Sequence, residues 1–326
     1  YNVMFARRGA VAAVRSQADL ARAGRIVEAM RGCGVEVDLL DAAAALARAP
    51  LLAAPGPVLG AIWQARAGVA REDAVTWAYA RAADEFGVEI VQNCGVAGFL
   101  VQNRRCVGVE TASGEIRADA VVLAAARGCG ELARKAGFDL PLRPCRLETI
   151  VSEPVASCLD PVVVDLGSGM SLFQAGEGEI VLSARAPRHA AGEQGDAATW
   201  RDAVAGMCGM PGRFAELRMR RWSETLDATA DAAPVLGRSP VAGIHLNCGW
   251  GAEGFNAAPA AGWLAAHAVA TGTPHPLGTA FGLGRFGRDA CDDADAAARM
   301  PDGDAHHPGP AGVQPGIPRP ECLLQK

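Results

Sequence analysis

The stretch that decides the fold runs from Val88 to Ala126 and reads VEIVQNCGVAGFLVQNRRCVGVETASGEIRADAVVLAAA. Its apolar runs are short, and polar turns at Asn103-Arg104 and Ser113-Gly114 separate them, which is typical of strands joined by tight turns. We therefore predict a short strand, then a meander of three strands, and finally an apolar strand from Ala120 to Ala126. Because that last run is apolar on both faces, we expect it to lie in a parallel sheet covered by helices.

Helical periodicity appears on both sides of this stretch. Before it, we predict a helix over QADLARAGRIVEAMRG that stops at Gly34, a short helix capped by Asp41, and a helix from about Glu72 to Phe86 closed by Gly87. After it, GELARKAG predicts one more helix.

From Leu147 the pattern changes to short apolar runs separated by Gly- or Pro-containing turns. The runs are LETIVSEPV, VVVDL, MSLFQAG and EIVLSARA, and they predict an antiparallel sheet. A further helix is expected near Thr199 to Met207. The Pro- and Gly-rich tail after Gly287 is expected to be disordered.

Composition narrows the function classes. The chain has 326 residues, half of them hydrophobic, which suits roughly two domains. It carries 31 Lys and Arg against 36 Asp and Glu, and this net charge of -5 argues against a nucleic-acid-binding surface. No run of about 18 uncharged residues is apolar enough to span a membrane.

Ten cysteines and six histidines raise the question of a metal site. No C-x-x-C occurs, so we expect no zinc site and interpret the cysteines as small apolar residues of a cytoplasmic protein. Two other groups could be drawn as metal ligands, His306-His307 and Asp292-Asp293. Because they lie on the Pro- and Gly-rich tail, a solvated linker is the preferred interpretation.

One literal match to the dinucleotide fingerprint G-x-G-x-x-G occurs at Gly249, Gly251 and Gly254. An apolar run precedes it and an alanine-rich helical stretch follows, so backbone N–H groups could face an anion there. The fingerprint also needs an acidic residue about 20 positions further on, and none follows before Asp289. We therefore interpret it as a strand-to-helix glycine loop that does not open a Rossmann unit.

The order of these patterns resembles a known family. A meander before a buried ADAVVLAAA strand, an antiparallel sheet, the motif D-x-T-x-D-x-x-P-x-x-G from Asp227 to Gly237, and LNCGWG follow one another. This order resembles the flavoprotein amine oxidoreductases of the D-amino-acid oxidase and sarcosine oxidase type, with the strongest likeness to sarcosine oxidase beta subunits. The likeness runs from Tyr1 to about Phe286.

The resemblance implies an α/β fold, α+β overall: a Rossmann-like FAD-binding parallel sheet joined to an antiparallel substrate domain. It places the pyrophosphate-binding βαβ unit before Tyr1, so we expect an N-terminally truncated sheet that lacks its first unit. We expect a substrate-domain segment at residues 1–62, an FAD-domain segment at 63–146 and the antiparallel substrate domain at 147–226. The flavin loop and final helix of the FAD domain are expected at 227–286, followed by a disordered tail at 287–326.

The resemblance also assigns site residues, each of which is otherwise an ordinary turn or core residue. Val96 would offer backbone atoms to the adenine end of FAD. The flavin ring would be lined by Gly249, Trp250, Gly251, Gly254 and Phe255. No catalytic side chain and no metal ligand are expected.

Four positions depart from the family pattern. Arg127 replaces a glycine that ends the buried strand, and Glu253 replaces a glycine of the loop. Asn256 stands where a lysine pairs with the substrate carboxylate, so it would bind that group without a charge. Cys145 aligns with the histidine that carries covalent FMN; a cysteine thiolate can attack a flavin, but a thiol in a Pro-flanked segment is more often inert.

Two functions follow. The first is a flavin-dependent enzyme that takes a hydride from the carbon next to a secondary amine such as sarcosine, giving an imine that hydrolyses. Its partners would be a small amine and possible further sarcosine oxidase subunits, without nucleic acid or membrane. The alternative is a catalytically silent relative, either truncated or a non-catalytic subunit. The four departures favour this alternative, whereas the overall pattern favours the flavin-dependent enzyme, which is the function we predict.

Overall fold

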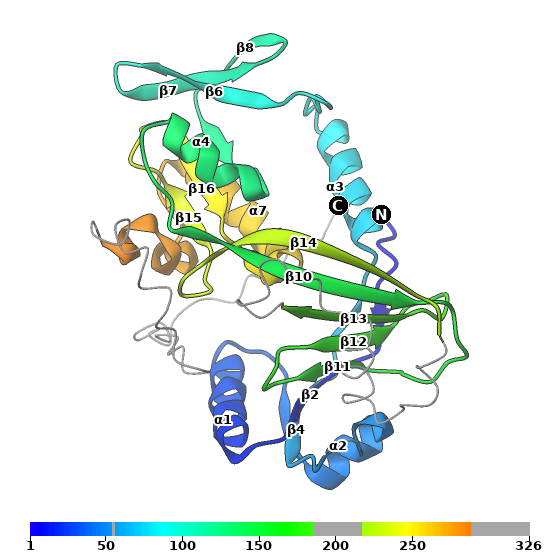
Figure 1. Ribbon diagram of the computed structural model, residues 1–326. Coiled ribbons are helices and arrows are strands. Elements are labelled where there is room, and N and C mark those ends of the chain that lie inside the picture. Colours follow the sequence, from blue (N-terminus) through cyan, green and yellow to red (C-terminus); the bar gives the residue numbers. More distant parts are fainter. Residues whose placement is uncertain (54–55, 186–216, 288–326) are drawn as a thin grey trace.

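An eight-stranded sheet is the largest element of the computed structural model, which describes residues 1–53, 56–185 and 217–287. Its order is β14-β10-β13-β12-β11-β2-β4-β3 (Figure 1). The strands are β2 (Ala10–Val14), β3 (Asp38–Asp41), β4 (Gly60–Gln64), β10 (Leu142–Ser152), β11 (Val162–Asp165), β12 (Ser171–Gln174), β13 (Ile180–Arg185) and β14 (Met219–Thr229). The four runs predicted after Leu147 are strands β10 to β13.

The predicted antiparallel pairing of these four runs is confirmed, and the sheet also contains one parallel pair that was not predicted. Strands β2 and β11 run parallel, whereas the other neighbours run antiparallel. The parallel pair was not predicted because β2 belongs to the first 14 residues, whereas its partner β11 lies more than 140 positions further along the chain. Local turn signals cannot specify such a distant pairing.

Helices cover this sheet near β2. The helix α1 (Gln17–Gly32) is capped by Ser16, whose side chain accepts from the Asp19 N–H, and α2 (Ala42–Arg48) is capped by Asp41 as predicted. Because side chains alternate along a strand, Val11 joins the core that contains α2, whereas Val14 joins the core beneath α1. Strand β2 is thus buried on both faces, and α1 and α2 flank it (Figure 1).

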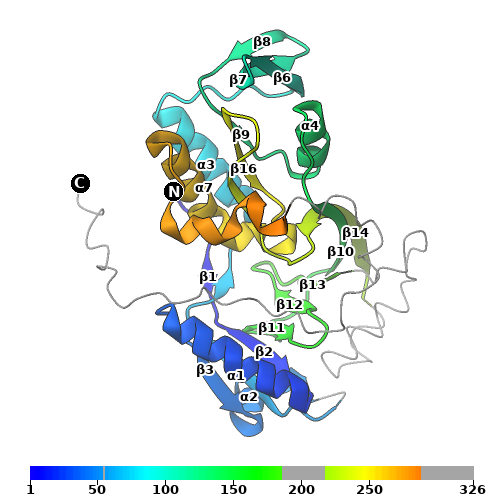
Figure 2. The same ribbon diagram turned by 90° about the vertical axis from the view of Figure 1, so that its left-hand side faces the viewer.

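The second part of the molecule is a three-stranded sheet with the order β15-β16-β9. Strands β9 (Val121–Leu123) and β16 (Ile244–Cys248) are parallel, and β15 (Val235–Arg238) is antiparallel to β16. The helices α4 (Cys129–Lys135) and α7 (Gly254–Thr271) accompany this sheet (Figure 2). The apolar side chains of Leu123, Leu246 and Leu132 meet in its core.

The predicted meander is confirmed as β6 (Val96–Gln102), β7 (Arg105–Thr111) and β8 (Gly114–Arg117). Asn103 and Arg104 form its first turn with φ of 51° and 62°. The meander meets the three-stranded sheet where Cys106 donates its N–H to the Ala242 carbonyl at 2.8 Å. A small pair, β1 (Ala6–Arg7) and β5 (Gly68–Val69), precedes α3 (Glu72–Glu85).

One prediction in the opening stretch was wrong, and another is confirmed only in part. No strand forms between Val88 and Val91, whose three apolar side chains are about half exposed. The apolar strand predicted from Ala120 to Ala126 is confirmed as β9, parallel to β16, but it is shorter than expected, and its middle residue Val122 is 41% exposed. Among the described residues β9 has a strand partner on one side only, so Val122 stays exposed while Leu123 packs in the core.

Helix α3 also leaves apolar side chains exposed. None of its residues is buried, although Trp77 and Tyr79 are large aromatic residues that are 59% and 52% exposed. Large apolar side chains exposed on a helix without a buried face are typical of a surface that another segment or chain covers. Helix α3, the Val88–Val91 segment and the β9 edge are together called the open face below.

Some expectations fall outside the described residues: the helix near Thr199–Met207, the tail beyond Gly287, and the groups Asp292-Asp293 and His306-His307. Within the described part of the chain, no helix is long and apolar enough to cross a lipid bilayer.

Candidate functional site

The loop between β16 and α7 lies where the parallel strands end. Strand β9 ends at Leu123 and β16 at Cys248, and because the two are parallel, the segments that follow them emerge at the same edge. Ligands of open α/β sheets bind at this carboxyl edge. The loop from Gly249 to Phe255, called the glycine loop below, is therefore the first candidate site.

The glycine loop has a conformation that requires glycine. Gly249 is buried with φ of 72°, and Gly251 has φ of 54°. A β-carbon at Gly249 would lie 2.9 Å from Leu142 Cδ2, closer than real β-carbons come, and 3.0 Å from Thr229 Cγ2, which is tighter than most β-carbon contacts. The two glycines thus combine a left-handed backbone with close packing.

Other loop residues are held or exposed in different ways. The Trp250 indole Nε1 donates to Asn247 Oδ1 at 2.7 Å, which fixes the ring over the strand end. Phe255 is 45% exposed and Asn256 is exposed, both in the first turn of α7. The helix begins at Gly254, so its first N–H groups lie beside this exposed surface.

Strands β10 and β14 support the glycine loop from the large sheet. Trp250 forms an isolated antiparallel bridge with Ala228 near the end of β14. Cys145, on β10, lies opposite Leu226, two residues before Ala228. The structure thus brings Cys145 to the strand pair that backs the loop, whereas Val96 lies apart, at the start of β6 in the meander sheet.

The end of β9 completes this edge. Residues 124–127 are exposed, and Ala126 adopts φ of 45°, a strained value for a residue other than glycine. Asp227 lies within electrostatic reach of Arg127. Burial raises the pKa of the Asp227 carboxyl, and the positive charge of Arg127 opposes that rise. Arg127 therefore contributes a cation to the same edge as the glycine loop.

Two buried thiols, those of Cys129 and Cys248, lie beside this edge. The Ala125 N–H donates to Cys129 Sγ at 3.2 Å. A hydrogen bond between the two thiols lowers the pKa of Cys129, and the same bond raises the pKa of Cys248. Cys129 thus shares contacts with both the end of β9 and the start of the glycine loop.

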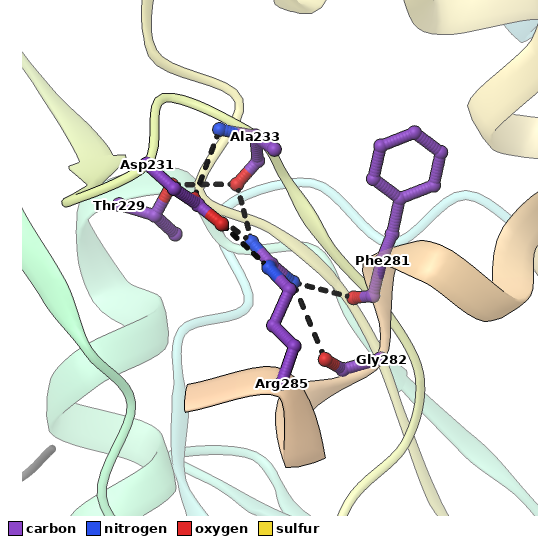
Figure 3. A network of polar contacts seen from close by, with 6 residues as sticks. All are labelled: Thr229, Asp231, Ala233, Phe281, Gly282 and Arg285. Atoms are coloured by element: carbon purple, nitrogen blue, oxygen red, sulfur yellow. Dashed lines mark hydrogen bonds and ion pairs between the residues drawn. The ribbon is translucent and has the colours of Figure 1, made fainter. Parts of the chain in front are cut away.

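A polar network joins the turn after β14 to the end of the described chain (Figure 3). Arg285 Nε donates to Asp231 Oδ2 at 2.7 Å, and Arg285 Nη2 donates to Asp231 Oδ1 at 3.1 Å. Thr229 Oγ1 donates to the same Oδ1 at 2.8 Å. Burial opposes ionisation of Asp231, but the hydrogen bonds from Arg285 and Thr229 prevail and lower its pKa.

Sequence reasoning missed this network. Thr229 and Asp231 stood in a quoted motif, but no role was inferred for either residue. Arg285 carried no local signal, because its partner Asp231 is 54 positions away. Only the fold brings the two together.

A separate cavity of about 410 Å³ lies at the opposite edge, where β9 and β16 begin. Arg105, Arg238 and His245 line it. Burial lowers the pKa of His245, as do the charges of the two arginines. The cavity is distinct from the glycine loop. No group of three or more metal-ligating side chains occurs within the described ranges.

Comparisons with known proteins identify the family of this chain. A family model described as FAD dependent oxidoreductase matches residues 1–268. The chain is 35% identical over 292 residues to a sarcosine oxidase subunit beta of Arthrobacter sp, covering 88% of this chain and 72% of the relative. A sarcosine oxidase subunit beta of Rhizobium meliloti (strain 1021) is 36% identical, with 88% and 70% covered.

Among solved structures, L-proline dehydrogenase from P. horikoshii superposes with a TM-score of 0.76. It is 23% identical, and the match covers 86% of this chain and 77% of that one, so it demonstrates a shared fold. The family match and the relatives go further than the fold. This chain belongs to the FAD-dependent oxidoreductases.

Proposed function

We propose that this chain supplies the flavin-ring contacts and the substrate sheet of an enzyme that oxidises the C–N bond of a secondary amine or amino acid such as sarcosine. The observation that carries the proposal is the glycine loop, which lies at the carboxyl edge of β9 and β16 against the end of β14. FAD, when bound, takes up the hydride from the carbon beside the amine nitrogen. Identity of 35% to a sarcosine oxidase beta subunit favours this function over a silent relative.

The described residues fit the ring end of FAD. Gly251 presents bare backbone, and Phe255 exposes an apolar ring at the start of α7. The first N–H groups of α7 favour negative charge beside them, because the helix dipole has its positive end there. We infer that Gly249, Trp250, Gly251, Gly254 and Phe255 line the flavin ring and that Val96 contacts the adenine end.

Asn256 is our candidate for the substrate carboxylate. Its amide donates a hydrogen bond but carries no charge, so it stabilises a desolvated carboxylate less than a lysine would. Glu253 adds a negative charge in the preceding turn and works against anion binding. Arg127 provides a cation at the same edge, which supports binding of an anionic group there. We assign no covalent FMN to Cys145.

The phosphate end of FAD needs more than the described residues offer. Strands β9 and β16 are adjacent and parallel, but the chain between them runs through the large sheet, so no crossover helix joins them as in a βαβ unit. We propose that a βαβ unit pairs with the β9 edge and covers the open face. The half-exposed Val122 and the unburied helix α3 support this.

The relatives support a proposal about assembly, and the thiols support one about the cellular compartment. Two relatives are named as beta subunits, so we propose that this chain works with further subunits of the same enzyme. The seven cysteines of the described residues are all free thiols, which suits the cytoplasm.

A pair of amines tests the function. Sarcosine and glycine differ only by the N-methyl group. Because both carry the same carboxylate, comparing them shows whether the enzyme prefers a secondary amine to a primary one. The flavin-loaded protein, with its βαβ unit, is mixed anaerobically with each, and bleaching of the flavin absorbance is followed. We expect sarcosine to bleach it and glycine to act far more slowly. Bleaching by neither sarcosine nor other secondary amines would overturn the proposal.

A further inference from the structure

The Arg285 side chain uses its complete donor set. Its Nε and Nη2 bind the two oxygens of Asp231, and Nη2 also donates to the Ala233 carbonyl at 2.8 Å. Nη1 donates to the carbonyls of Phe281 and Gly282 at 2.8 and 3.3 Å. A guanidinium has five N–H donors in a planar fork, and five contacts are made here. Arg285 therefore ties the segment Leu283–Phe286 to the turn after β14 (Figure 3).

That turn depends on these bonds. Asp231 Oδ1 also accepts from the Ala233 N–H at 3.1 Å and from the Thr229 hydroxyl. Ala232, inside the turn, has φ of 57°, a conformation that costs free energy unless the surroundings impose it. The turn from Thr229 to Ala233 is thus strained and is held by Asp231, which Arg285 holds in turn.

Thr229 connects the turn to the glycine loop. Its side chain is buried, and its methyl carbon Cγ2 is the atom that would lie 3.0 Å from a β-carbon on Gly249. Its neighbour Ala228 bridges to Trp250. A shift of the turn therefore moves the surface on which Gly249 and Trp250 rest.

We propose that Arg285 is a positioning residue of the flavin site: through Asp231 and Thr229 it holds the glycine loop in the conformation that receives the flavin ring. The flavin part of this statement rests on the proposed function. The mechanical part, a clamp that orders residues 248–254, does not.

Hydrogen–deuterium exchange of the flavin-free chain tests the clamp. In Arg285→Ala we expect exchange of the peptide covering residues 248–254 to rise about tenfold or more, because charge-assisted bonds are lost. Peptides from β10 and β13 should keep wild-type rates. Arg285→Lys keeps the charge but not the fork, so it should recover only part of the protection.

Two further variants make the test specific. Thr229→Ser keeps the hydroxyl bonds and removes only Cγ2, so it should loosen the loop while the Arg285–Asp231 pair persists. Arg238→Ala is the matched control: Arg238 donates to the Gly272 carbonyl at the other end of α7, and its loss should leave residues 248–254 unchanged. Wild-type loop exchange in Arg285→Ala, or an equal rise in Arg238→Ala, would overturn the clamp. If Arg285→Ala raises exchange throughout the fold, the test is exchange of residues 248–254 in Thr229→Ser, and wild-type rates there would overturn the clamp.

A spectroscopic arm separates the two parts of the proposal. In the flavin-loaded protein, Arg285→Ala should shift the visible flavin absorbance maximum, and Arg285→Lys should shift it less. A loosened loop with an unshifted spectrum would overturn the assignment of the loop to the flavin, and with it the proposed site, while leaving the clamp standing.

Discussion

Gly249 packs on Thr229 so closely that a β-carbon at Gly249 would lie 3.0 Å from Thr229 Cγ2. This contact joins the two halves of the candidate site, because Gly249 opens the glycine loop of the small sheet and Thr229 ends β14 of the large one. The loop is therefore held on the large sheet both by this close packing and by the backbone bridge from Trp250 to Ala228. Its conformation and its packing both depend on the absence of a side chain at Gly249.

Gly249→Ala should destabilise the protein more than its backbone angle alone explains. We expect a loss of about 3 kcal/mol in the free energy of unfolding, from strain plus overpacking. Gly272→Ala is the matched control, since Gly272 has φ of 71° but its nearest neighbour would be an Arg238 nitrogen 3.7 Å away. It should cost about 1 kcal/mol. Urea denaturation gives both values, and equal losses would mean that the Thr229 contact is unimportant.

A buried ion pair in the large sheet should matter much more than an exposed one. Glu148 is 3% exposed and binds Arg146 and Arg221, with Arg221 Nε donating to Glu148 Oε2 at 2.7 Å. Glu148→Gln should cost about 3 kcal/mol, because the arginines lose a buried counter-charge. Glu131→Gln removes the exposed pair with Lys135 and should cost about 0.5 kcal/mol or less. Thermal unfolding of both variants checks the contrast, which fails if the two shifts are similar.

Acid should release the clamp at Asp231. Its pKa is lowered in the folded state, so its contribution to stability is complete above the ordinary value of 3.8 and is lost as the pH falls through the lower folded value. Unfolding free energies between about pH 3 and 7 should therefore fall less steeply in Asp231→Asn than in the wild type. Identical slopes would mean that Asp231 titrates as it does in the unfolded chain.

Much of the local structure was predictable from sequence because its signals are local. The turn at Asn103-Arg104 and the caps at Asp41 and Gly87 lie within a few residues of the elements they end. The parallel pair of β2 and β11 was missed because its register depends on distant residues. The burial of β9 was overestimated because an apolar pattern reveals which faces are apolar, and only the fold reveals which of them are covered.

The candidate site divides in the same way. The glycine loop was visible in the sequence as three spaced glycines, and the structure gives each of its residues a position at one sheet edge. Arg285 and Asp231 had no shared local pattern, so their pairing emerged only from the fold. The roles of Val96, Cys145 and Asn256 toward cofactor and substrate stay predictions.

Asn256→Lys should improve the use of sarcosine. A lysine would add its charge beside the positive end of α7, and both act on the substrate carboxylate. The apparent KM should fall about tenfold with little change in kcat, because the carboxylate is present in ground and transition states alike. Asn256→Met controls for side-chain length. Glu253→Gly should help in the same direction without simple additivity. If the Asn256 enzyme already matches the lysine variant, the carboxylate is held elsewhere.

The same chain should not retain FAD unless a βαβ unit completes its sheet. The phosphate-binding N–H groups of such folds come from that unit. Gel filtration after incubation with FAD should leave the chain colourless, whereas the form that carries the unit should elute yellow. A flavin absorbance band that co-elutes with the chain alone would contradict the prediction.

The measurement that tests the central claim most directly is hydrogen–deuterium exchange of the protein that carries its βαβ unit, with and without FAD. We predict that FAD slows exchange at residues 248–256 and 124–128, the two segments at the carboxyl edge of β16 and β9, and leaves α2 unchanged. Protection that omits residues 248–256 would contradict the assignment of the glycine loop to the flavin ring.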